Sequence, residues 1–572
     1  MESFGSLSGL AGAPVPLWQR AWLDAYPSGV PSSLSYPNMP VSALLEMAAH
    51  HFPQRTACTV YGSGMTYAQL AERAYRLAGA LARLGAGPGR RVGMLMPNIP
   101  EYIVALQATW LTGGTVLQLS PLMVADEIRK WLEMTDCRIV VCLDLFAPTV
   151  LEAHGDDSPL EHLVVVSLAE RLAPWRGWLY RMERLRRHGP LRLRDDDQVH
   201  RFDQLARTAP VESRPSIQPM EDVALMAPTG GTTASPKAVM LTHRNLVANA
   251  FQIQAWSRQR PEAEVHVLGV LPFFHAYGLS VCLLSSLVGG WTVHMHPRFE
   301  TQAVLDLLTR YRIAMVPAVP AMLAALNRSL REQPRDLSFI EAVISGASAL
   351  SHTVRSEFES FGPKNVVEGY GLTEASPVTH VNPLDDNNRP GTIGLPLPDT
   401  EARIVDEATG REELPTGSVG ELIIRGPQVM KGYFQNPQET ARALRDGWLY
   451  TGDMARRDHD GYFTIVDRKK DIIKTSGFLV YPAEVEEVLL RFPGITEAAV
   501  IGVPDDERGE VIQAAVVPKN GTLDLEALEQ HCLTHLSKHK RPKKIEVVKE
   551  LPKNFLGKIQ RRKVREATRE EV

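Results

Sequence analysis

The sequence predicts an α/β protein, with a large N-terminal domain of layered sheets and helices, a β-rich subdomain and a small α+β C-terminal domain. The first observation is the length of 572 residues, which exceeds what one hydrophobic core usually organises. The second is an alternation of continuous apolar strands with amphipathic helices from residue 56 onward, typical of parallel sheets covered on both faces. The third is a change beyond Gly391, where hairpin patterns replace that alternation.

The early elements illustrate the alternation of strands and helices. Thr66 is a candidate N-cap, and the helix after it carries one apolar stripe made of Leu70, Ala74, Leu77, Leu81 and Leu84. Buried strands are predicted at residues 91–96, 116–119 and 138–143, and a further helix at 102–111. Strands that follow one another through helices run parallel, so this region predicts a parallel sheet.

Residues 267–293 form a long apolar stretch that resembles a membrane span in a hydropathy profile. Pro272, His275 and Gly278 interrupt it, and paired glycines follow at Gly289 and Gly290. Such breaks favour a buried strand, a loop and a helix over one spanning helix.

Composition excludes several classes of protein. The hydrophobic fraction of 44% with 22% charged residues is that of a soluble globular protein, and the formal net charge of −4 offers no general attraction to nucleic acid. The five cysteines are scattered, which indicates neither a zinc site nor a disulfide framework. The first 14 residues lack the pattern of a secretory signal, so a cytoplasmic location is expected.

Residues 171–194 depart from the alternating pattern. A helix here places Trp175, Trp178, Leu179, Met182 and Leu185 on one face, with arginines away from its centre. This arrangement suits a helix lying in a membrane interface, which would make the protein peripheral to the inner face of the membrane. A surface helix docked on its own domain, with solvated arginines, is the alternative.

The C-terminal part has a different texture. Residues 419–426 read as a strand with turns at both ends, and 458–466 carry an Asp-Gly hairpin signal. The charged run 467–471 precedes a tail with strands near 498–503 and 511–517 and a helix from Leu525. We therefore predict an N-terminal domain of residues 1–467 and a C-terminal domain of residues 468–572.

Residues 229–237, T-G-G-T-T-A-S-P-K, have the composition of a phosphate-binding loop. Small residues let backbone N–H groups converge on an anion, the hydroxyl groups add donors, and Lys237 adds a positive charge. The spacing is not that of a Walker loop. A polar surface turn between a strand and a helix has the same composition, so the loop alone leaves both interpretations open.

Four further motifs follow this loop along the chain: E-G-Y-G-L-T-E at 368–374, Y-T-G-D at 450–453, D-R-K-K-D-I-I-K at 467–474 and P-K-N-F-L-G-K-I at 552–559. In this order, the set resembles the adenylate-forming superfamily of acyl-CoA synthetases, luciferases and non-ribosomal peptide adenylation domains. The likeness spans about residues 40–565. Within the superfamily, the chain is most similar to long-chain fatty acyl-CoA synthetases.

The resemblance implies a reaction in two steps. A carboxylate attacks the α-phosphate of ATP to give acyl-AMP and pyrophosphate, and the thiol of CoA then displaces AMP. By matching position, the β- and γ-phosphates would be held by Thr229, Gly230, Gly231, Thr232, Thr233 and Lys237. Glu374 would ligate Mg²⁺, Thr373 would donate toward the α-phosphate, and Lys558 would bridge the carboxylate and phosphate as they react.

Other matched positions would bind the nucleoside. Gly346, Ala347, Tyr370 and Gly371 would surround the adenine, with the aromatic face as a stacking platform. Asp453 would accept hydrogen bonds from the ribose hydroxyls, and Arg468 would support the same sugar.

The second step implies a mobile C-terminal domain that turns about a charged hinge, here Lys470. Rotation would bring a different face of the tail to the active site, carrying Lys474 as a further catalytic residue. Lys474 and Gly477 match positions that line the entry of the CoA thiol. A charged hinge that stays in water reorients without a desolvation cost.

The segment 271–278 is expected to border the acyl group and includes His275 and Gly278. It contains no Asp or Glu to meet the ammonium of an amino acid, which argues against an amino acid as substrate. The segment is dominated by apolar residues, and its resemblance to fatty acyl-CoA synthetases implies a medium- to long-chain fatty acid as the substrate. Aryl or other apolar acids, transfer to a carrier protein in place of CoA, and a silent nucleotide-binding scaffold remain alternatives. Nothing in the sequence points to nucleic acid as a partner, and the oligomeric state, a homodimer included, stays open.

Overall fold

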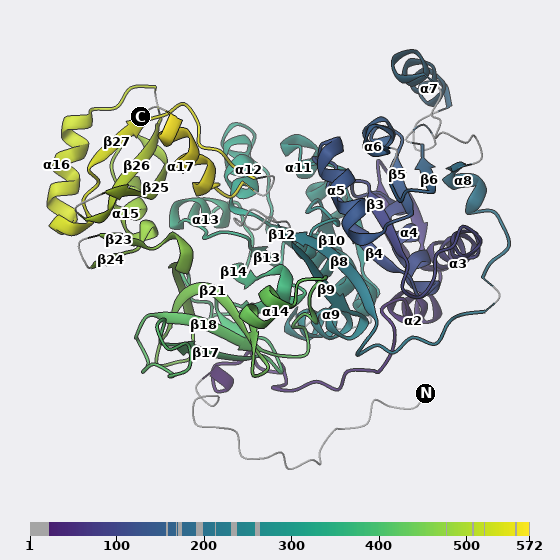
Figure 1. Ribbon diagram of the computed structural model, residues 1–572, viewed down its shortest axis with the longest axis horizontal. Helices are drawn as coiled ribbons and strands as arrows, with labels where there is room; N and C mark the ends of the chain where they lie inside the picture. Colours follow the sequence, from purple (N-terminus) through teal and green to yellow (C-terminus); the bar gives the residue numbers. More distant parts are fainter. Residues whose placement is uncertain are drawn as a thin grey trace, which may run out of the picture.

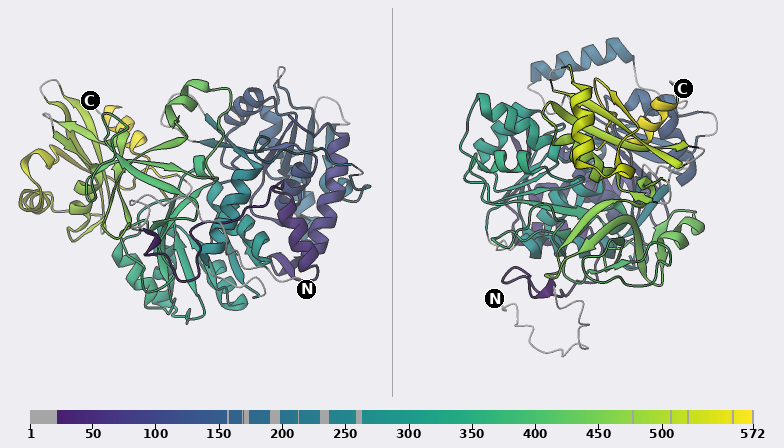
Figure 2. Two further views of the ribbon diagram at one scale, coloured as in Figure 1. Left: turned by 90° about the horizontal axis from the view of Figure 1, so that it is seen from below. Right: turned by 90° about the vertical axis from the view of Figure 1, so that its left-hand side faces the viewer.

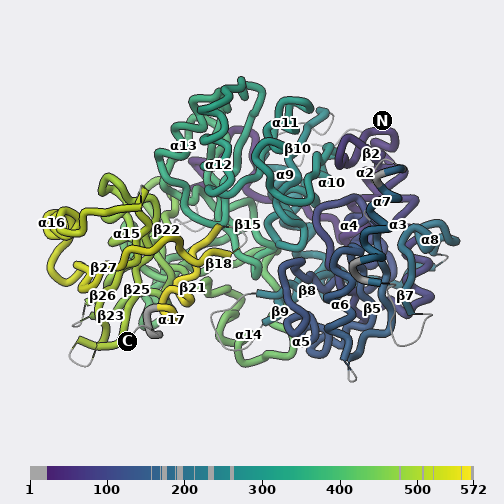
Figure 3. Tube along the Cα trace, turned by 90° about the horizontal axis from the view of Figure 1, so that it is seen from above, coloured from purple at the N-terminus to yellow at the C-terminus, as the bar shows by residue number. Residues whose placement is uncertain are grey.

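The computed structural model describes residues 22–155, 158–167, 169, 174–189, 198–211, 213–229, 237–257, 263–475, 478–505, 508–519, 521–554 and 557–570. Within these residues the chain forms four sheets (Figure 1). The two largest sheets carry the alternating pattern of the sequence. The two smaller ones follow in the C-terminal part of the chain, which lies at the opposite end of the molecule from α3 (Tyr67–Arg83) and α8 (Phe202–Leu205) (Figures 2 and 3).

The first sheet has nine strands in the order β16-β15-β14-β13-β12-β10-β11-β1-β2. All neighbouring pairs from β14 to β1 are parallel, and the strands at the two ends are antiparallel. The strands are β1 (Thr56–Val60), β2 (Ser63–Thr66), β10 (His266–Gly269), β11 (Thr292–Met295), β12 (Met315–Ala318), β13 (Ala342–Ser345), β14 (Val366–Gly371), β15 (Val378–Val381) and β16 (Leu395–Pro396).

The second sheet has eight strands in the order β19-β9-β8-β4-β3-β5-β6-β7. They are β3 (Arg91–Leu95), β4 (Thr115–Gln118), β5 (Ile139–Leu143), β6 (His162–Val166), β7 (Val199–Arg201), β8 (Val223–Thr229), β9 (Lys237–Thr242) and β19 (Gly432–Tyr433). The predicted phosphate loop joins β8 to β9, an antiparallel pair in which Thr229 lies opposite Lys237. Residues 230–236 of that loop lie outside the described residues.

Helices fill the space between the two large sheets. All twelve residues of α4 (Pro100–Leu111) are buried, and the helix contacts β1 of the first sheet as well as β3 and β4 of the second. A mostly apolar helix that is buried on every side belongs in such a shared core. The other helices of this part are α2 (Ala43–His51), α5 (Ala125–Thr135), α6 (Ala147–Ala153), α7 (Pro174–His188), α9 (His243–Ser257), η3 (Gly278–Leu284), α10 (Ser285–Gly289), α11 (Thr301–Tyr311), α12 (Pro320–Glu332), α13 (His352–Glu359) and η4 (Thr373–Ala375).

The third and fourth sheets have five strands each. The third contains β17 (Glu401–Val405), β18 (Gly420–Arg425), β20 (Leu444–Arg445), β21 (Trp448–Arg457) and β22 (Phe463–Arg468), with α14 (Pro437–Ala443) beside it. After the short turn η5 (Lys469–Asp471), the fourth contains β23 (Ile473–Thr475), β24 (Phe478–Val480), β25 (Ile495–Asp505), β26 (Gly509–Pro518) and β27 (Lys544–Val547), with α15 (Pro482–Leu490), α16 (Leu525–His535), η6 (Lys538–Lys540) and α17 (Arg561–Glu570).

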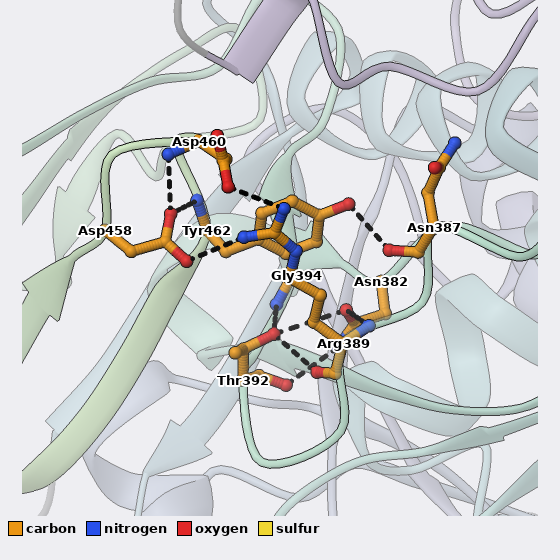
Figure 4. Close-up of polar contacts among 8 residues, drawn as sticks. All are labelled: Asn382, Asn387, Arg389, Thr392, Gly394, Asp458, Asp460 and Tyr462. Carbon is orange, nitrogen blue, oxygen red and sulfur yellow. Dashed lines mark hydrogen bonds and ion pairs between the residues drawn. The ribbon is translucent and has the colours of Figure 1, made fainter.

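A polar network fastens the third sheet to the loop between β15 and β16 (Figure 4). Arg389 pairs with Asp458 at 3.0 Å and with Asp460 at 2.7 Å, both in the turn between β21 and β22. Its guanidinium lies 4.1 Å from the centre of the Tyr462 ring, and the Tyr462 hydroxyl donates to the carbonyl of Asn387 at 2.7 Å. One arginine therefore joins two regions that are about 70 residues apart along the chain.

Most local predictions are confirmed. α3 begins after Thr66, whose side chain accepts from the Gln69 amide while the Gln69 side chain accepts from the Thr66 amide. The strands predicted near 91–96, 116–119 and 138–143, the hairpin at 458–466 and the elements of the tail are present. The stretch 267–293 forms β10, a loop, η3, α10 and β11, and no helix among the described residues is long and apolar enough to cross a membrane.

Replacing Arg389 by lysine should lower the free energy of unfolding by about 1 kcal/mol, because an ammonium cannot reach both carboxylates and stack on Tyr462 in the same way. Urea unfolding followed by circular dichroism measures this change. The matched control is Arg491→Lys, which alters an exposed pair with Glu487 on one helix and should cost only a few tenths of a kcal/mol. Equal losses in the two variants would contradict the role given to Arg389.

Candidate active site

A cavity of about 820 Å³ lies where the first sheet, the third sheet and the C-terminal tail meet. Its polar end is at the carboxyl ends of β12, β13 and β14, the edge at which parallel α/β sheets bind ligands. The cavity brings together many of the predicted site residues: Thr229, Lys237, His275, Gly346, Ala347, Tyr370, Gly371, Thr373, Glu374, Asp453, Arg468, Lys470 and Lys558.

The remaining predicted residues lie elsewhere. Gly230, Gly231, Thr232, Thr233 and Gly477 are outside the described residues. Gly278 does not line the cavity: a Cβ atom there would lie 2.2 Å from the carbonyl oxygen of Pro272, so the position needs glycine for a close backbone approach. Lys474 is exposed on β23 and also lies away from the cavity.

Asp453 is the centre of the nucleoside end of the cavity. Its carboxylate is almost fully buried, accepts from the Tyr370 hydroxyl at 2.5 Å and pairs with Arg468 at 2.9 Å. Asp453 and Arg468 lie opposite each other in the β21–β22 hairpin, so strand register fixes this pair. Burial and the Asp453 carboxylate raise the pKa of Tyr370, which keeps its hydroxyl protonated as a donor. Asp453 retains lone pairs for two sugar hydroxyls.

The loop after β13 forms another wall of the cavity. Ala347 has a φ of 69°, a left-handed conformation that residues other than glycine seldom adopt. A Cβ atom on Gly346 would lie 3.0 Å from the Tyr277 ring, so glycine lets the ring pack against the backbone. The Tyr277 hydroxyl donates to the carbonyl of Ile344 at 2.7 Å. Tyr277 is a lining residue that the sequence analysis did not single out.

Two carboxylates and a lysine lie at the phosphate end. Tyr433 donates to Glu374 at 2.9 Å, and Lys237 pairs with Glu439 while its ammonium lies 5.2 Å from the centre of the Tyr433 ring. The hydrogen bond from Lys237 lowers the pKa of Glu439, so this carboxyl group is ionised near pH 7. A bound polyphosphate would therefore compete with Glu439 for Lys237.

The donor set at Glu374 fits Mg²⁺ that arrives with a nucleotide. Within the described parts of the chain, no group of three or more His, Cys, Asp or Glu side chains forms a ready-made metal cage. Mg²⁺ is commonly held by one or two carboxylates together with phosphate oxygens and water. Glu374 in the cavity wall supplies such a carboxylate.

Lys558 enters the cavity from the C-terminal tail. Two hydrogen bonds to Asn554 hold its backbone. The Lys558 backbone N–H donates to the side-chain oxygen of Asn554 at 2.9 Å, and the Asn554 backbone N–H donates to the Lys558 carbonyl at 2.9 Å. Burial lowers the pKa of Lys558 to about 8, and the positive charges of Arg468 and Lys470 act in the same direction. These neighbouring cations would stabilise a bound anionic ligand, and they repel one another when no anion lies between them.

The rest of the cavity is apolar and runs along the first sheet toward the amino ends of its strands. Val267, Trp291 and Met315 lie at or next to those amino ends and line the cavity, whereas Gly346 lies just beyond a carboxyl end. Tyr277, Val281 and Ser285 line it from η3 and α10 at intervals of four residues. The three residues therefore lie at increasing depth in the cavity, from Tyr277 beside the nucleoside wall to Ser285 near the far end.

His275 also lines this region. Burial lowers the pKa of His275 to about 4, so the imidazole is neutral near pH 7. A neutral ring suits an apolar channel better than a charged one.

Several lining residues were not predicted, namely Trp256, Tyr277, Trp291, Tyr433, Glu439, Arg442 and Asn554. Tyr277 lies in the segment 271–278 and Asn554 in the segment 552–559, so their position in these motifs is a usable signal. Tyr433 and Glu439 reach the site because β19 pairs with β9, a contact between strands far apart in the chain. No local sequence pattern predicts the pairing of two strands so far apart in the chain.

Comparisons with known proteins agree with this geometry. The AMP-binding enzyme family matches residues 45–434, and the AMP-binding enzyme C-terminal domain matches residues 484–558. The long-chain-fatty-acid–CoA ligase of Bacillus subtilis is 38% identical over 96% of this chain and 98% of its own length. The ligase of that name from Escherichia coli O6:H1 is 34% identical over 97% of this chain and 99% of its own.

Solved structures show the same fold. ATP-bound MatB from Rhodopseudomonas palustris matches with a TM-score of 0.78 and 29% identity, over 92% of this chain and 99% of its own. A fatty acyl CoA synthetase of Mycobacterium tuberculosis matches with a TM-score of 0.69 and 26% identity, over 92% and 98% of the two chains. The predicted α/β architecture, with its large N-terminal and small C-terminal domains, is confirmed, and the chain belongs to the AMP-binding enzyme family.

Proposed function

We propose that the protein is an AMP-forming fatty acid–CoA ligase, which converts a fatty acid, ATP and CoA into acyl-CoA, AMP and pyrophosphate. The observation that carries the proposal is a single cavity with a nucleotide-type polar end and a long apolar end. The relatives named long-chain-fatty-acid–CoA ligase support it, because they match nearly the whole chain.

In the first step, a carboxylate oxygen of the fatty acid attacks the α-phosphorus of ATP, and the bond from that phosphorus to the bridging oxygen breaks to release pyrophosphate. Two anions must meet, so cations at the reacting atoms lower the barrier. We assign this role to Lys558, with Thr373 as a further donor. Asp453, Arg468 and Tyr370 would hold the nucleoside while this happens.

The phosphates would lie toward Thr229 and Lys237, together with the glycines and threonines of the loop that follows Thr229. Glu374 would hold Mg²⁺, which neutralises charge on the phosphate oxygens when bound. Lys237 would leave Glu439 for the phosphates. Arg442, which also pairs with Glu439, would keep that carboxylate paired after the exchange.

The second step requires a different face of the C-terminal domain, and we propose a division between residues 467 and 468. Lys558 lies in the cavity whereas Lys474 lies outside it, an arrangement suited to the first step. Lys470 lies on η5, where the chain leaves β22, and its side chain is exposed although it also lines the cavity. This position between the third and fourth sheets suits a hinge. Rotation about it would exchange Lys558 for Lys474 and Gly477, and the CoA thiolate would then attack the acyl carbon and expel AMP.

The depth of the apolar end predicts a graded dependence on chain length. Ser285→Phe should reduce kcat/KM for the longest fatty acids roughly tenfold or more and spare medium chains, whereas Val281→Phe, one turn nearer the nucleoside wall, should reduce both. AMP release from a panel of linear and aryl acids measures this order. Short acids serve as the internal control, and loss of activity toward them as well would indicate misfolding. The same cut-off in both variants would contradict the proposed direction of the chain.

Two lysine variants separate the half-reactions. Lys558→Ala should slow acyl-AMP formation by about 10²–10³-fold and spare thioester formation from supplied acyl-AMP, while Lys474→Ala should show the reverse preference. Fatty-acid-dependent ATP–pyrophosphate exchange reports the first step, and acyl-CoA formation from acyl-AMP reports the second. Lys553→Ala is the control, because Lys553 lies outside the cavity in a pair with Glu497. Equal loss of both steps in both variants would rule out the two-face mechanism.

The lowered pKa of Lys558 predicts a pH dependence. The active form is the cation, which is present below the folded pKa of about 8 and is lost as pH rises through it. ATP–pyrophosphate exchange, expressed as kcat/KM for ATP, should therefore fall by about tenfold per pH unit above that value. Lys558→Arg should be slower but should keep a flat profile over the same range, because a guanidinium stays charged. An unchanged fall in the arginine variant would assign the titration to another group.

A further inference from the structure

Helix α7 (Pro174–His188) lies on the outside of the second sheet, and in the sequence it lies between β6 and the edge strand β7. It projects from one corner of the molecule in Figure 1 and lies across the top of the right-hand view of Figure 2. None of the described residues of α7 lines the cavity.

The apolar face of α7 points away from the rest of the protein. Five large apolar side chains are exposed, at 61%, 61%, 50%, 50% and 48% for Trp175, Trp178, Leu179, Met182 and Leu185 respectively. They recur at the spacing of one helical face. A helix that only covered its own domain would turn this face inward, so the alternative of simple docking does not account for it.

The opposite face attaches the helix to the protein. Tyr180 donates to Asp144 at 2.7 Å, and Asp144 also accepts from Ser167 at 3.1 Å. Gly177 is buried, and a Cβ atom there would lie 2.5 Å from the carbonyl oxygen of Ala169. The Tyr180–Asp144 hydrogen bond and the close backbone approach at Gly177 therefore hold the helix in an orientation that leaves its tryptophans exposed.

The charge of the helix points to what covers the apolar face. Its sequence contains five arginines and one acid, Glu183, although the whole chain has a net charge of −4. Arg181 and Arg186 are exposed beside the apolar side chains, and Arg186 pairs with Glu183 at 3.2 Å. Tryptophans and leucines flanked by arginines match the boundary between acyl chains and anionic headgroups.

We propose that α7 is a docking helix for an anionic lipid surface. The apolar face enters the headgroup region while the arginines pair with lipid phosphates, and Tyr180 and Gly177 keep the enzyme body on the water side. For an enzyme that activates a water-insoluble acid, such docking places the protein where that acid is concentrated. This last consequence rests on the proposed function, whereas the docking itself does not.

Vesicle co-sedimentation of the full chain tests the proposal without substrate. Binding should be strong on phosphatidylcholine vesicles that contain phosphatidylglycerol, weak on pure phosphatidylcholine, and reduced by salt, with a blue shift of tryptophan emission. The double variant Trp175→Ala/Trp178→Ala should bind roughly tenfold or more weakly through lost apolar burial. Arg181→Gln/Arg186→Gln should lose roughly thirtyfold at low salt, at about 1 kcal/mol per arginine.

The matched control is Leu122→Ala/Val124→Ala, a pair of similarly exposed apolar residues in the connection between β4 and α5, which should bind vesicles like the parent protein. ATP–pyrophosphate exchange with a short soluble acid should persist in every variant and shows that each one folds. Absence of binding by the parent protein, or parent-like binding by the tryptophan variant, overturns the proposal. A dimer that the tryptophan variant converts to monomer, without vesicle binding, also overturns it and assigns the face to a second copy. Intact vesicle binding without any activity would count against the proposed function alone.

Discussion

The buried carboxylate of Asp453 is the constraint on which the site depends. At 3% exposure it needs partners, because an unpaired charge in the interior costs several kcal/mol. Its partners come from β14 of the first sheet, through Tyr370, and from the end of β22, through Arg468. Satisfying one carboxylate therefore holds the third sheet against the first and places the chain at Arg468, next to the turn that leads into the C-terminal sheet.

The cavity has two chemically different ends, and Asp453 lies at the polar one. Asp453, Arg468 and Lys558 crowd charge at the carboxyl ends of the parallel strands, where loops supply polar groups. At or next to the amino ends of those strands, buried side chains such as Trp291 and Met315 line the cavity and make this end apolar. A substrate with an anionic head and an apolar tail fits both ends at once.

Local features could be predicted from the sequence because their causes are local. Thr66 and Gln69 stand three residues apart and cap α3 reciprocally, and the Asp-Gly turn before β22 needs only its own residues. The motifs of the candidate site were equally visible, because the residue types suited to nucleotide chemistry occur together in short segments. Their convergence on one cavity could not be predicted from periodicity.

Features that depend on tertiary contacts could not be predicted. Tyr433 approaches Lys237 only because β19 adds to the edge of the second sheet beside β9. The pattern of α7 predicted one apolar face and one basic face, but not the direction in which the apolar face points. That direction is set by Tyr180 and Asp144, which are 36 residues apart.

The contacts of Arg561 in the C-terminal region fit the rotation that the proposed second step requires. Arg561 of α17 makes two hydrogen bonds to Glu486 of α15, at 2.7 and 3.0 Å, and both residues belong to the C-terminal region. Its contact with Asp467 of β22, across the proposed division, is longer at 3.6 Å. A rotation at Lys470 would break this long contact, and also the 2.7 Å hydrogen bond that the Ala483 amide of α15 donates to Asp467, but it would keep the two hydrogen bonds to Glu486. The buried arginine would therefore keep its main partner in both states, which avoids the cost of an unpaired buried charge.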